Sequence, residues 1–193
     1  MNKKIITAAL FVLMLSGCQS NKALDSKLSM GAEIVTYAGT ALSGTVLGSC
    51  RTEFDSGQKG RTNNLRLAAE KINGIIIMPG EIFSFNGSVG PTAKQNGFMK
   101  ANVFSKGRLI KNYGGGVCQV SSTLYNACLE GGLEIVERHP HSGRVNYVPK
   151  NRDAATSYGG IDFKFKNNYN SPVAVNASVE GGSLICSVSR AMA

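Results

Sequence analysis

Residues 114–127 read GGGVCQVSSTLYNA, and the rest of the chain is best understood from this stretch outward. Three consecutive glycines lead to a single cysteine, Cys118, at the start of a segment whose apolar residues recur with helical spacing. The first turn of a helix has unpaired backbone N–H groups and a partial positive charge, and these lower the pKa of a thiol placed there. We therefore predict a helix that carries Cys118 at its beginning as a candidate nucleophile. Gly115 and Gly116 are candidate substrate-binding positions, because glycine lets a substrate backbone approach closely.

The predicted helix has one apolar face and one polar edge. Its buried face consists of Val117, Val120, Leu124, Ala127 and Cys128. Ser121, Ser122 and Tyr125 follow Cys118 at helical intervals and share its edge. Among the polar residues of this helix, Gln119 and Ser121 are candidate hydrogen-bond donors to a substrate, and ordinary helix surface polarity explains them equally well.

The composition is that of a globular protein with a basic surface. Of 193 residues, 42% are hydrophobic and 17% charged, and the 23 glycines with no tryptophan favour a turn-rich, mixed or mainly β architecture. The formal net charge of +9 suits an anionic partner such as a cell-wall polymer or a membrane surface. The basic residues are scattered and no nucleic-acid-binding motif is present, which argues against nucleic acid as the partner.

The first residues have the features of an export signal. Lys3 and Lys4 precede an apolar run at residues 5–15, and Leu15-Ser16-Gly17-Cys18 looks like the lipobox of bacterial lipoproteins. The apolar run is short for a membrane-spanning helix. We predict a lipoprotein signal peptide at residues 1–17, lipidation of Cys18, a polar tether at residues 18–32 and one domain at residues 33–193. The domain is expected outside the cytoplasm, held to a membrane by its lipid.

The remaining cysteines do not form a recognisable framework. Cys50, Cys118, Cys128 and Cys186 have irregular spacings that match neither a zinc site nor a small disulfide-rich domain. Cys118 and Cys128 lie ten residues apart on one predicted helix, too distant to pair. A bond between Cys50 and Cys186 stays open. Cys128 and Cys186 lie in apolar patterns, which favours buried free thiols.

Outside the cysteine helix, the patterns predict a single α+β domain with a mostly antiparallel sheet and two main helices. A first helix is expected at residues 65–72, capped by residues 62–64. Strands are expected within residues 33–50 and at 75–78, 81–85, 133–138, 144–148 and 161–165, with a hairpin formed by 173–179 and 184–188. Residues 86–97 are expected to be a loop. Residues 98–113 are ambiguous, with a strand at 103–110 interrupted at Gly107.

A nucleophilic cysteine needs a base, and the base needs a group that orients it. The chain has two histidines, His139 and His141, on either side of a proline in one loop, and we choose His141 as the base with His139 in reserve. Asp153, Asp162 and Glu137 are candidate orienting groups. The sequence does not separate these carboxylates, and Asp153 is our working choice.

Two other chemistries find little support. Metal binding by Cys118, His139 and His141 has no ligand-spacing motif behind it. Phosphate binding at residues 114–116 is disfavoured because no Lys-Ser/Thr pair of a P-loop follows the glycines. We predict no metal and no cofactor.

Several motifs together resemble the VanW-domain family of bacterial cell-envelope proteins. These are the stretch at residues 114–127 and the motifs at 79–86, 89–91, 138–142, 147–149, 152–154 and 162–168, so the resemblance covers roughly residues 50–180. Asn151 stands where the family often has glycine, a mild departure because asparagine tolerates left-handed geometry. Many relatives carry a further N-terminal wall-binding region, for which this chain is expected to be too short.

The resemblance implies a function. Members of the family are linked to glycopeptide resistance and to L,D-transpeptidation, in which a cysteine forms an acyl-enzyme with a peptidoglycan stem peptide. Carried over to this chain, the nucleophile is Cys118 and the histidine is His141. Arg138 and Arg144, near the histidine loop, are candidates for holding a stem-peptide carboxylate, with solvated strand ends as the alternative. A peptidoglycan hydrolase that uses the same residues, and a non-catalytic wall-binding or assembly lipoprotein, are the two other hypotheses.

Overall fold

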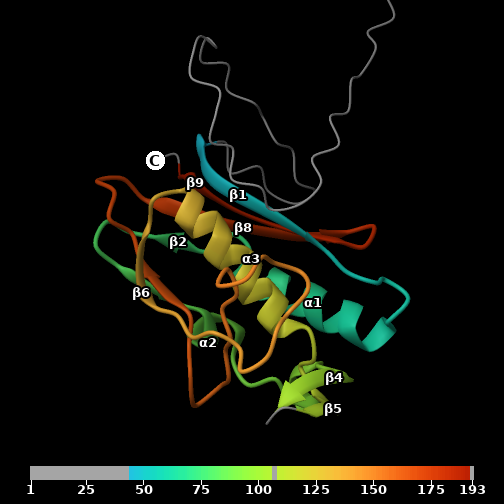
Figure 1. The fold of residues 1–193 in the computed structure, drawn as a ribbon. Coiled ribbons are helices and arrows are strands. Elements are labelled where there is room, and N and C mark those ends of the chain that lie inside the picture. The colour runs from blue at the N-terminus through green and yellow to red at the C-terminus, as the bar shows by residue number, and fades with distance from the viewer. Residues whose placement is uncertain (1–43, 106–107, 192–193) are drawn as a thin grey trace, which may run out of the picture.

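The computed structural model describes residues 44–105 and 108–191 (Figure 1). The predicted signal peptide, the lipidation site at Cys18, the tether at residues 18–32 and the predicted start of the domain at residue 33 lie outside the described residues. The described chain is a single α+β domain with antiparallel sheets and two main helices, accompanied by a short third helix. This confirms the predicted fold class.

The main sheet joins the first and last described strands. Its order is β1-β9-β8-β2 and every pairing is antiparallel. The predicted hairpin is confirmed, with Glu180 opposite Ser183. Gly181 and Gly182 between them have positive φ angles of 55° and 91°, which the favoured two-residue turns between antiparallel strands require. The strands are β1 (Val46–Glu53), β2 (Ile76–Ile77), β8 (Val173–Glu180) and β9 (Ser183–Arg190).

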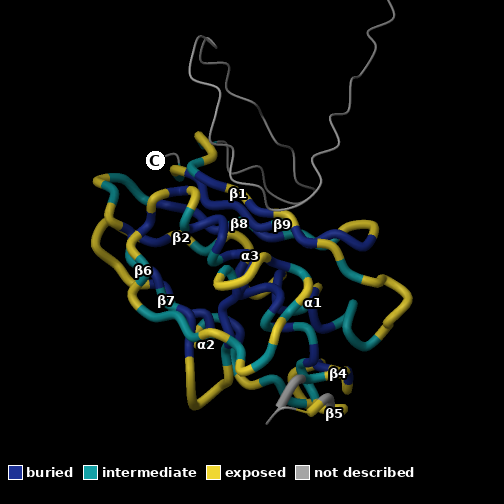
Figure 2. The backbone as a smooth tube through the Cα atoms, in the orientation of Figure 1, coloured by how far each residue is buried: buried dark blue, intermediate teal, exposed yellow. Residues whose placement is uncertain are grey.

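The two main helices, α1 (Lys59–Ile72) and α3 (Val117–Glu130), cover one face of this sheet (Figure 1). Burial concentrates where the sheet and the helices meet (Figure 2). The predicted apolar faces are confirmed, because every residue assigned to them is buried: Leu65, Ala68, Ala69 and Ile72 on α1, and Val117, Val120, Leu124, Ala127 and Cys128 on α3. Burial of these faces against the sheet, at about 25 cal/mol per Å² of apolar surface, is what holds both helices in place.

Helix α1 begins earlier than predicted, at Lys59, and the cap predicted at residues 62–64 is wrong. The polar side chains there have other partners. Asn64 is fully buried, and its Nδ2 donates to the carbonyl oxygens of Met99 (2.9 Å) and Gly115 (3.0 Å). Asn64 therefore anchors the glycine segment before α3 instead of capping its own helix.

A smaller sheet has the order β3-β7-β6, and its strands β6 and β7 lie below β1, β8 and β9 in the view of Figure 2. Its strands are β3 (Ile82–Ser84), β6 (Glu134–Glu137) and β7 (Lys164–Lys166). The rings of Phe83 and Phe165 stack across β3 and β7 with centroids 4.9 Å apart, and Phe163 extends the cluster toward Tyr125 of α3. The predicted loop at residues 86–97 contains the short helix α2 (Phe85–Val89) and a 3-10 turn (Lys94–Asn96).

The ambiguous region at residues 98–113 is a β-hairpin. Strands β4 (Lys100–Ser105) and β5 (Arg108–Tyr113) pair in continuous register and lie apart from the other two sheets (Figure 1). The second strand runs straight into Gly114, so the hairpin delivers the glycine segment to the start of α3.

The predicted strands at 81–85 and 133–138 are each shorter by two residues, and three others are also shorter than expected or absent. Residues 144–148 form an irregular loop with no strand. At residues 75–78 only β2 forms; it is the last strand of the main sheet, and one side of it faces solvent, which leaves Ile76 48% exposed. In the segment 161–165 the strand begins only at Lys164.

The cysteines agree with the buried-thiol prediction. Cys128 and Cys186 are free and fully buried, and burial raises the pKa of both thiols. Cys50 lies opposite Cys186 in the β1–β9 register. Because Cys186 is a free thiol, the bond between these two residues that the sequence left open is not formed.

Candidate active site

The three glycines are required by the path of the backbone into α3. Gly114 and Gly116 have φ angles of 83° and 107°, in the left-handed region that favours glycine. A Cβ on Gly115 would lie 2.6 Å from the Asn102 carbonyl oxygen of β4. The helix begins at Val117, directly after Gly116, so Cys118 is its second residue.

Replacing Gly115 with alanine is expected to lower the free energy of unfolding by about 1–3 kcal/mol, because the new methyl group would press on backbone atoms of β4 that cannot move aside easily. Gly160→Ala is the matched control, since a Cβ there meets Ser157 at an ordinary 3.5 Å. Urea unfolding of both variants measures the difference. Equal midpoints would contradict the close packing described above.

The Cys118 thiol is partly accessible and has two partners. It donates to the Thr156 carbonyl oxygen at 3.4 Å, and its sulfur lies 3.8 Å from the Thr156 hydroxyl oxygen. The His141 side chain is near enough to act on the charge of the sulfur. Burial by itself would raise the pKa of the Cys118 thiol, but the neighbouring His141 and the hydrogen bonds with Thr156 hold that pKa below its ordinary value. A thiol in this environment ionises more readily than a free cysteine.

His141 is held by a carboxylate on its far side. Its Nδ1 lies 2.6 Å from Asp153 Oδ2, and its backbone N–H donates to the same oxygen at 2.6 Å. With Nδ1 used in this way, Nε2 is the ring nitrogen left for Cys118. Burial would lower the pKa of His141, but the contacts with Cys118 and Asp153 raise it above its ordinary value.

Arg138 completes the chain of contacts. Its Nη2 lies 2.9 Å from Asp153 Oδ1, its Nε donates to the Asp153 carbonyl oxygen at 2.6 Å, and its guanidinium lies over the Tyr125 ring. Burial would raise the pKa of Asp153, but the hydrogen bonds from His141 keep it below the ordinary value of a carboxyl. The structure therefore brings together Cys118, His141, Asp153 and Arg138 in that order.

The other candidates for base and orienting group have different neighbours. His139 Nε2 lies 3.0 Å from Glu137, and Glu137 is ion-paired with Lys164 at 2.8 Å. Asp162 accepts from the Ser84 hydroxyl (2.6 Å) and from the Asn86 backbone. These residues tie together the small sheet and its adjoining loops.

Two helix residues predicted to contact substrate are buried. The Ser121 hydroxyl donates to the Ala154 carbonyl oxygen at 2.7 Å. The Gln119 amide donates to Thr52 and to the Glu53 carbonyl oxygen, both at 3.0 Å, and accepts from Arg61. Their hydrogen bonds join α3 to its neighbours, and Gln119 also reaches the cleft described next.

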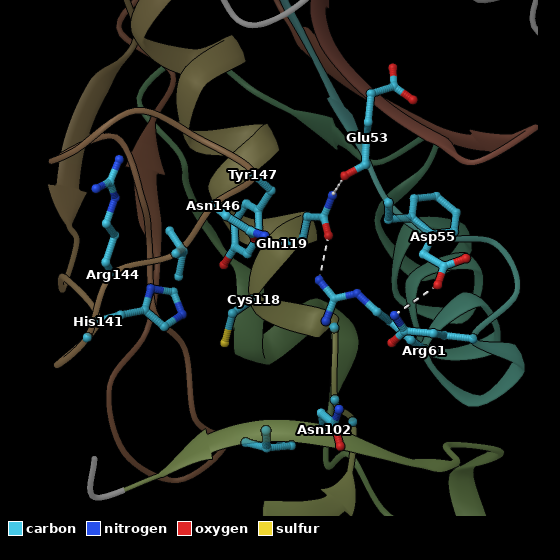
Figure 3. Close-up of a pocket in the computed structure, with 18 residues that line it drawn as sticks. Glu53, Asp55, Arg61, Asn102, Cys118, Gln119, His141, Arg144, Asn146 and Tyr147 are labelled. Carbon is cyan, nitrogen blue, oxygen red and sulfur yellow. Dashed lines mark hydrogen bonds between the residues drawn. The ribbon is translucent and has the colours of Figure 1, made fainter. Parts of the chain in front are cut away.

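A cleft of about 420 Å³ opens beside Cys118 (Figure 3). Of the predicted residues it is lined by Gly115, Gly116, Cys118, Gln119, His141 and Arg144, and its lining does not include Ser121 or Arg138 among the described residues. A volume of this size lies in the range of about 300–1,000 Å³ that is typical of ligand pockets. The exposed Arg144 stands on the same side of Cys118 as His141 (Figure 3).

Among the cleft residues that sequence reasoning missed, Arg61 and Tyr147 have the side chains best suited to bind a substrate. Arg61 lies on α1, ahead of the predicted start of that helix, and no local pattern marked it. Tyr147 was part of a family motif but was assigned to a strand, and it lines the cleft. Burial raises the pKa of Tyr147, so the phenol stays protonated and can donate a hydrogen bond.

Membrane-spanning helices and metal clusters are both missing from residues 44–105 and 108–191. None of the helices in these ranges is long and apolar enough to cross a membrane. Within the same ranges, no three side chains of His, Cys, Asp or Glu come together in a way that would hold a metal ion.

Comparison with known proteins gives two family matches. A family model described as VanW like protein matches residues 60–189. A model described as prokaryotic membrane lipoprotein lipid attachment site matches residues 3–19, which include Cys18, and supports the predicted anchoring to a membrane.

Two curated proteins are similar to this chain. The "Uncharacterized protein YoaR" of Bacillus subtilis is 46% identical over 139 residues, which are 72% of this chain and 46% of that protein. The "Vancomycin B-type resistance protein VanW" of Enterococcus faecalis is 35% identical over 116 residues, 58% of this chain and 42% of that protein. The chain thus spans a little under half the length of these relatives. No solved structure matches it.

Proposed function

The chain belongs to the VanW-like family, and on that premise we propose that it is a cell-envelope cysteine acyltransferase acting on peptidoglycan stem peptides, in the manner of an L,D-transpeptidase. The observation that carries the proposal is the cleft lined by both Cys118 and His141, with Asp153 on the far side of the imidazole at 2.6 Å from His141 Nδ1. Nucleophile, base and orienting carboxylate in this order are the arrangement that acyl transfer requires. The name of the enterococcal relative, a vancomycin resistance protein, supports a role in the cell envelope.

The first step is attack on the peptide carbonyl. The lowered pKa of Cys118 and the raised pKa of His141 favour a thiolate–imidazolium pair before substrate binds. The amides of Val117 and Gln119 already donate to Gly114 (3.0 Å) and Gly116 (2.8 Å). Because the Cys118 amide has no partner among the described residues, we assign it to the developing oxyanion.

The second step releases the leaving group and transfers the acyl group. His141 gives its proton to the amine as the C–N bond breaks, which leaves a thioester on Cys118. An acceptor amine from a second stem peptide then attacks the thioester and passes a proton to His141, and the new amide forms as the thiolate leaves. Asp153 keeps the His141 ring oriented and stabilises its charge, and Arg138 holds Asp153 in place.

Lipid attachment at Cys18 would hold the domain at the membrane surface, where the substrate is assembled. We propose residues 1–17 as the signal peptide, residues 18–32 as the tether and the outer side of the membrane as the location. The positive charge of the chain suits the anionic wall polymer.

Replacing His141 with alanine is expected to slow alkylation of Cys118 by iodoacetamide at pH 7 by about tenfold or more. In the wild type, alkylation rises with pH through a thiol pKa below the ordinary value, since only the thiolate reacts. Without His141, burial is the dominant effect left and raises that pKa, so the midpoint moves to higher pH. His139→Ala is the control, because His139 contacts Glu137 and not Cys118. A midpoint that stays unchanged in His141→Ala would contradict the ion pair.

The reaction itself is tested with the purified protein and two stem peptides, one offering the scissile bond and one offering a free amine. Transfer predicts a cross-linked dimer whose yield rises with the acceptor concentration. Shortened donor peptide with no dimer would show a hydrolase that uses the same residues, and recovery of both peptides unchanged would favour a non-catalytic wall-binding protein.

A further inference from the structure

Arg61 is a cation in the cleft without a carboxylate partner. Its side chain is half-buried, and its Nη2 donates to the neutral Gln119 Oε1 at 2.6 Å. Within the described residues, no Asp or Glu lies at ion-pair distance from it, whereas Arg51 and Arg138 each have one. Glu53 and Asp55 also line the cleft, but Glu53 is bonded to Arg51 and Ser183.

An arginine in this situation is short of partners. A guanidinium has five N–H donors in a planar fork that matches a carboxylate, and one bond to an amide oxygen leaves most of them unused. Burial lowers the pKa of Arg61, and the nearby Tyr147 and Cys118 side chains offset this effect only in part. An anionic group entering the cleft would supply both the charge and the second acceptor.

The position of Arg61 relative to Cys118 is fixed by the glycine segment. A Cβ on Gly116 would lie 3.0 Å from Arg61 Cγ, so the arginine stem runs against the residue that precedes α3. The close-up shows the Cys118 side chain between His141 and Arg144 on one side and Arg61 on the other (Figure 3). The reacting sulfur therefore has the base His141 on one side and, on the other, Arg61, a cation without a carboxylate partner in the part of the chain that the structure describes.

We propose that Arg61 binds a carboxylate of the donor peptide on the side of the scissile bond that stays attached to Cys118. His141 must face the leaving amine to protonate it, so the leaving part of the substrate extends toward His141 and the acyl part extends toward Arg61. This rests on the proposed function and deepens it. The preferred donor is a stem peptide with a free carboxylate N-terminal to the scissile bond, and amidation of that carboxylate makes it a poor donor.

Binding to the Cys118→Ala form tests this without turnover. The probes are two stem tetrapeptides that keep the C-terminal carboxylate and differ only in whether the carboxyl groups N-terminal to the scissile bond are free or amidated. Calorimetry is expected to show the free form binding about 10- to 100-fold more tightly, as for a charge-assisted bidentate contact. With Arg61→Gln added, this preference falls to about twofold or less, while Arg66→Gln, an exposed arginine on the same helix, leaves it unchanged.

Arg61→Lys separates a loss of binding from a loss of folding, since lysine keeps the positive charge but lacks the planar pair of N–H donors. It is expected to retain a smaller preference, about three- to tenfold, at an unchanged melting temperature. Equal binding of the two peptides by the protein that keeps Arg61, no binding of either, or a preference that survives Arg61→Gln each overturns the proposal.

Acylation of the protein that keeps Cys118 separates this proposal from the proposed function. If the binding preference depends on Arg61 but Cys118 is never acylated, the proposed function fails and the carboxylate site stands. If both peptides acylate Cys118 equally well and bind equally tightly, the carboxylate site fails and the proposed function stands.

Discussion

Replacing Cys118 with alanine is expected to abolish cross-linking of stem peptides, with a loss of at least about 10⁴-fold in rate. The reason is chemical, because no other cysteine described in the structure lines the cleft, and Cys128 and Cys186 are fully buried with raised pKa values. Reverse-phase analysis of the reaction products after a fixed time measures the effect.

Cys128→Ala is the matched control, since Cys128 lies on the same helix but faces the core. It is expected to keep the activity and to lose about 1 kcal/mol of stability through the small cavity it leaves. Cross-linking that survives in Cys118→Ala would show that the acyl group is carried elsewhere or not covalently at all.

The second large effect is expected from Asp153→Asn, with a loss of about 10²- to 10⁴-fold in transfer rate. The aspartate accepts from both the ring and the backbone of His141, and it carries the charge that Arg138 balances. Asparagine keeps the shape but removes that charge and can turn its amide N–H₂ toward Nδ1, which stabilises the wrong tautomer of His141. The pKa of His141 is then expected to fall, and that of Cys118 to rise, because each supports the charge of the other.

Asp162→Asn separates this role from a merely structural one. Asp162 is also a buried carboxylate of the histidine region, but it bonds to Ser84 and to the backbone of Asn86. Its replacement is expected to lower the melting temperature while leaving the pH dependence of Cys118 alkylation unchanged. A shift of the alkylation profile in Asp162→Asn equal to that in Asp153→Asn would show that both act only through folding.

The sequence was most informative where one local pattern determines the structure. The helical spacing of apolar residues placed α3 and its buried face correctly, since each of these side chains must face the sheet. The hairpin of β8 and β9 was predictable because Gly181 and Gly182 suit a turn that needs positive φ.

The failures have a common physical cause, which is that tertiary partners overrode a local preference. Residues 62–64 have cap-forming side chains, yet Asn64 is used to hold Met99 and Gly115. In residues 144–148 polar and apolar side chains alternate as in a strand, but the segment has no neighbouring strand to pair with. Tyr147 lines the cleft instead.

In the candidate site, too, the features set by neighbouring residues in the sequence were predictable and those set by tertiary contacts were not. Cys118 could be placed at a helix start from its own neighbours in sequence. The contact of His141 with Asp153 joins residues twelve positions apart in an irregular loop, which no period reveals, so three carboxylates remained equivalent until the structure was known. Arg61 reaches the cleft from another helix and was not foreseeable at all.

Acylation of Cys118 is measured most directly by intact mass spectrometry of the purified protein, quenched in acid shortly after a donor stem peptide is added. We expect a mass increase equal to the donor peptide minus its leaving amino acid, located on the proteolytic fragment that contains Cys118. The adduct should disappear when an acceptor amine is added, as cross-linked product appears. Formation of cross-linked product with an adduct on a different residue, or with no acyl group on Cys118 at any quench time, would contradict the proposed mechanism.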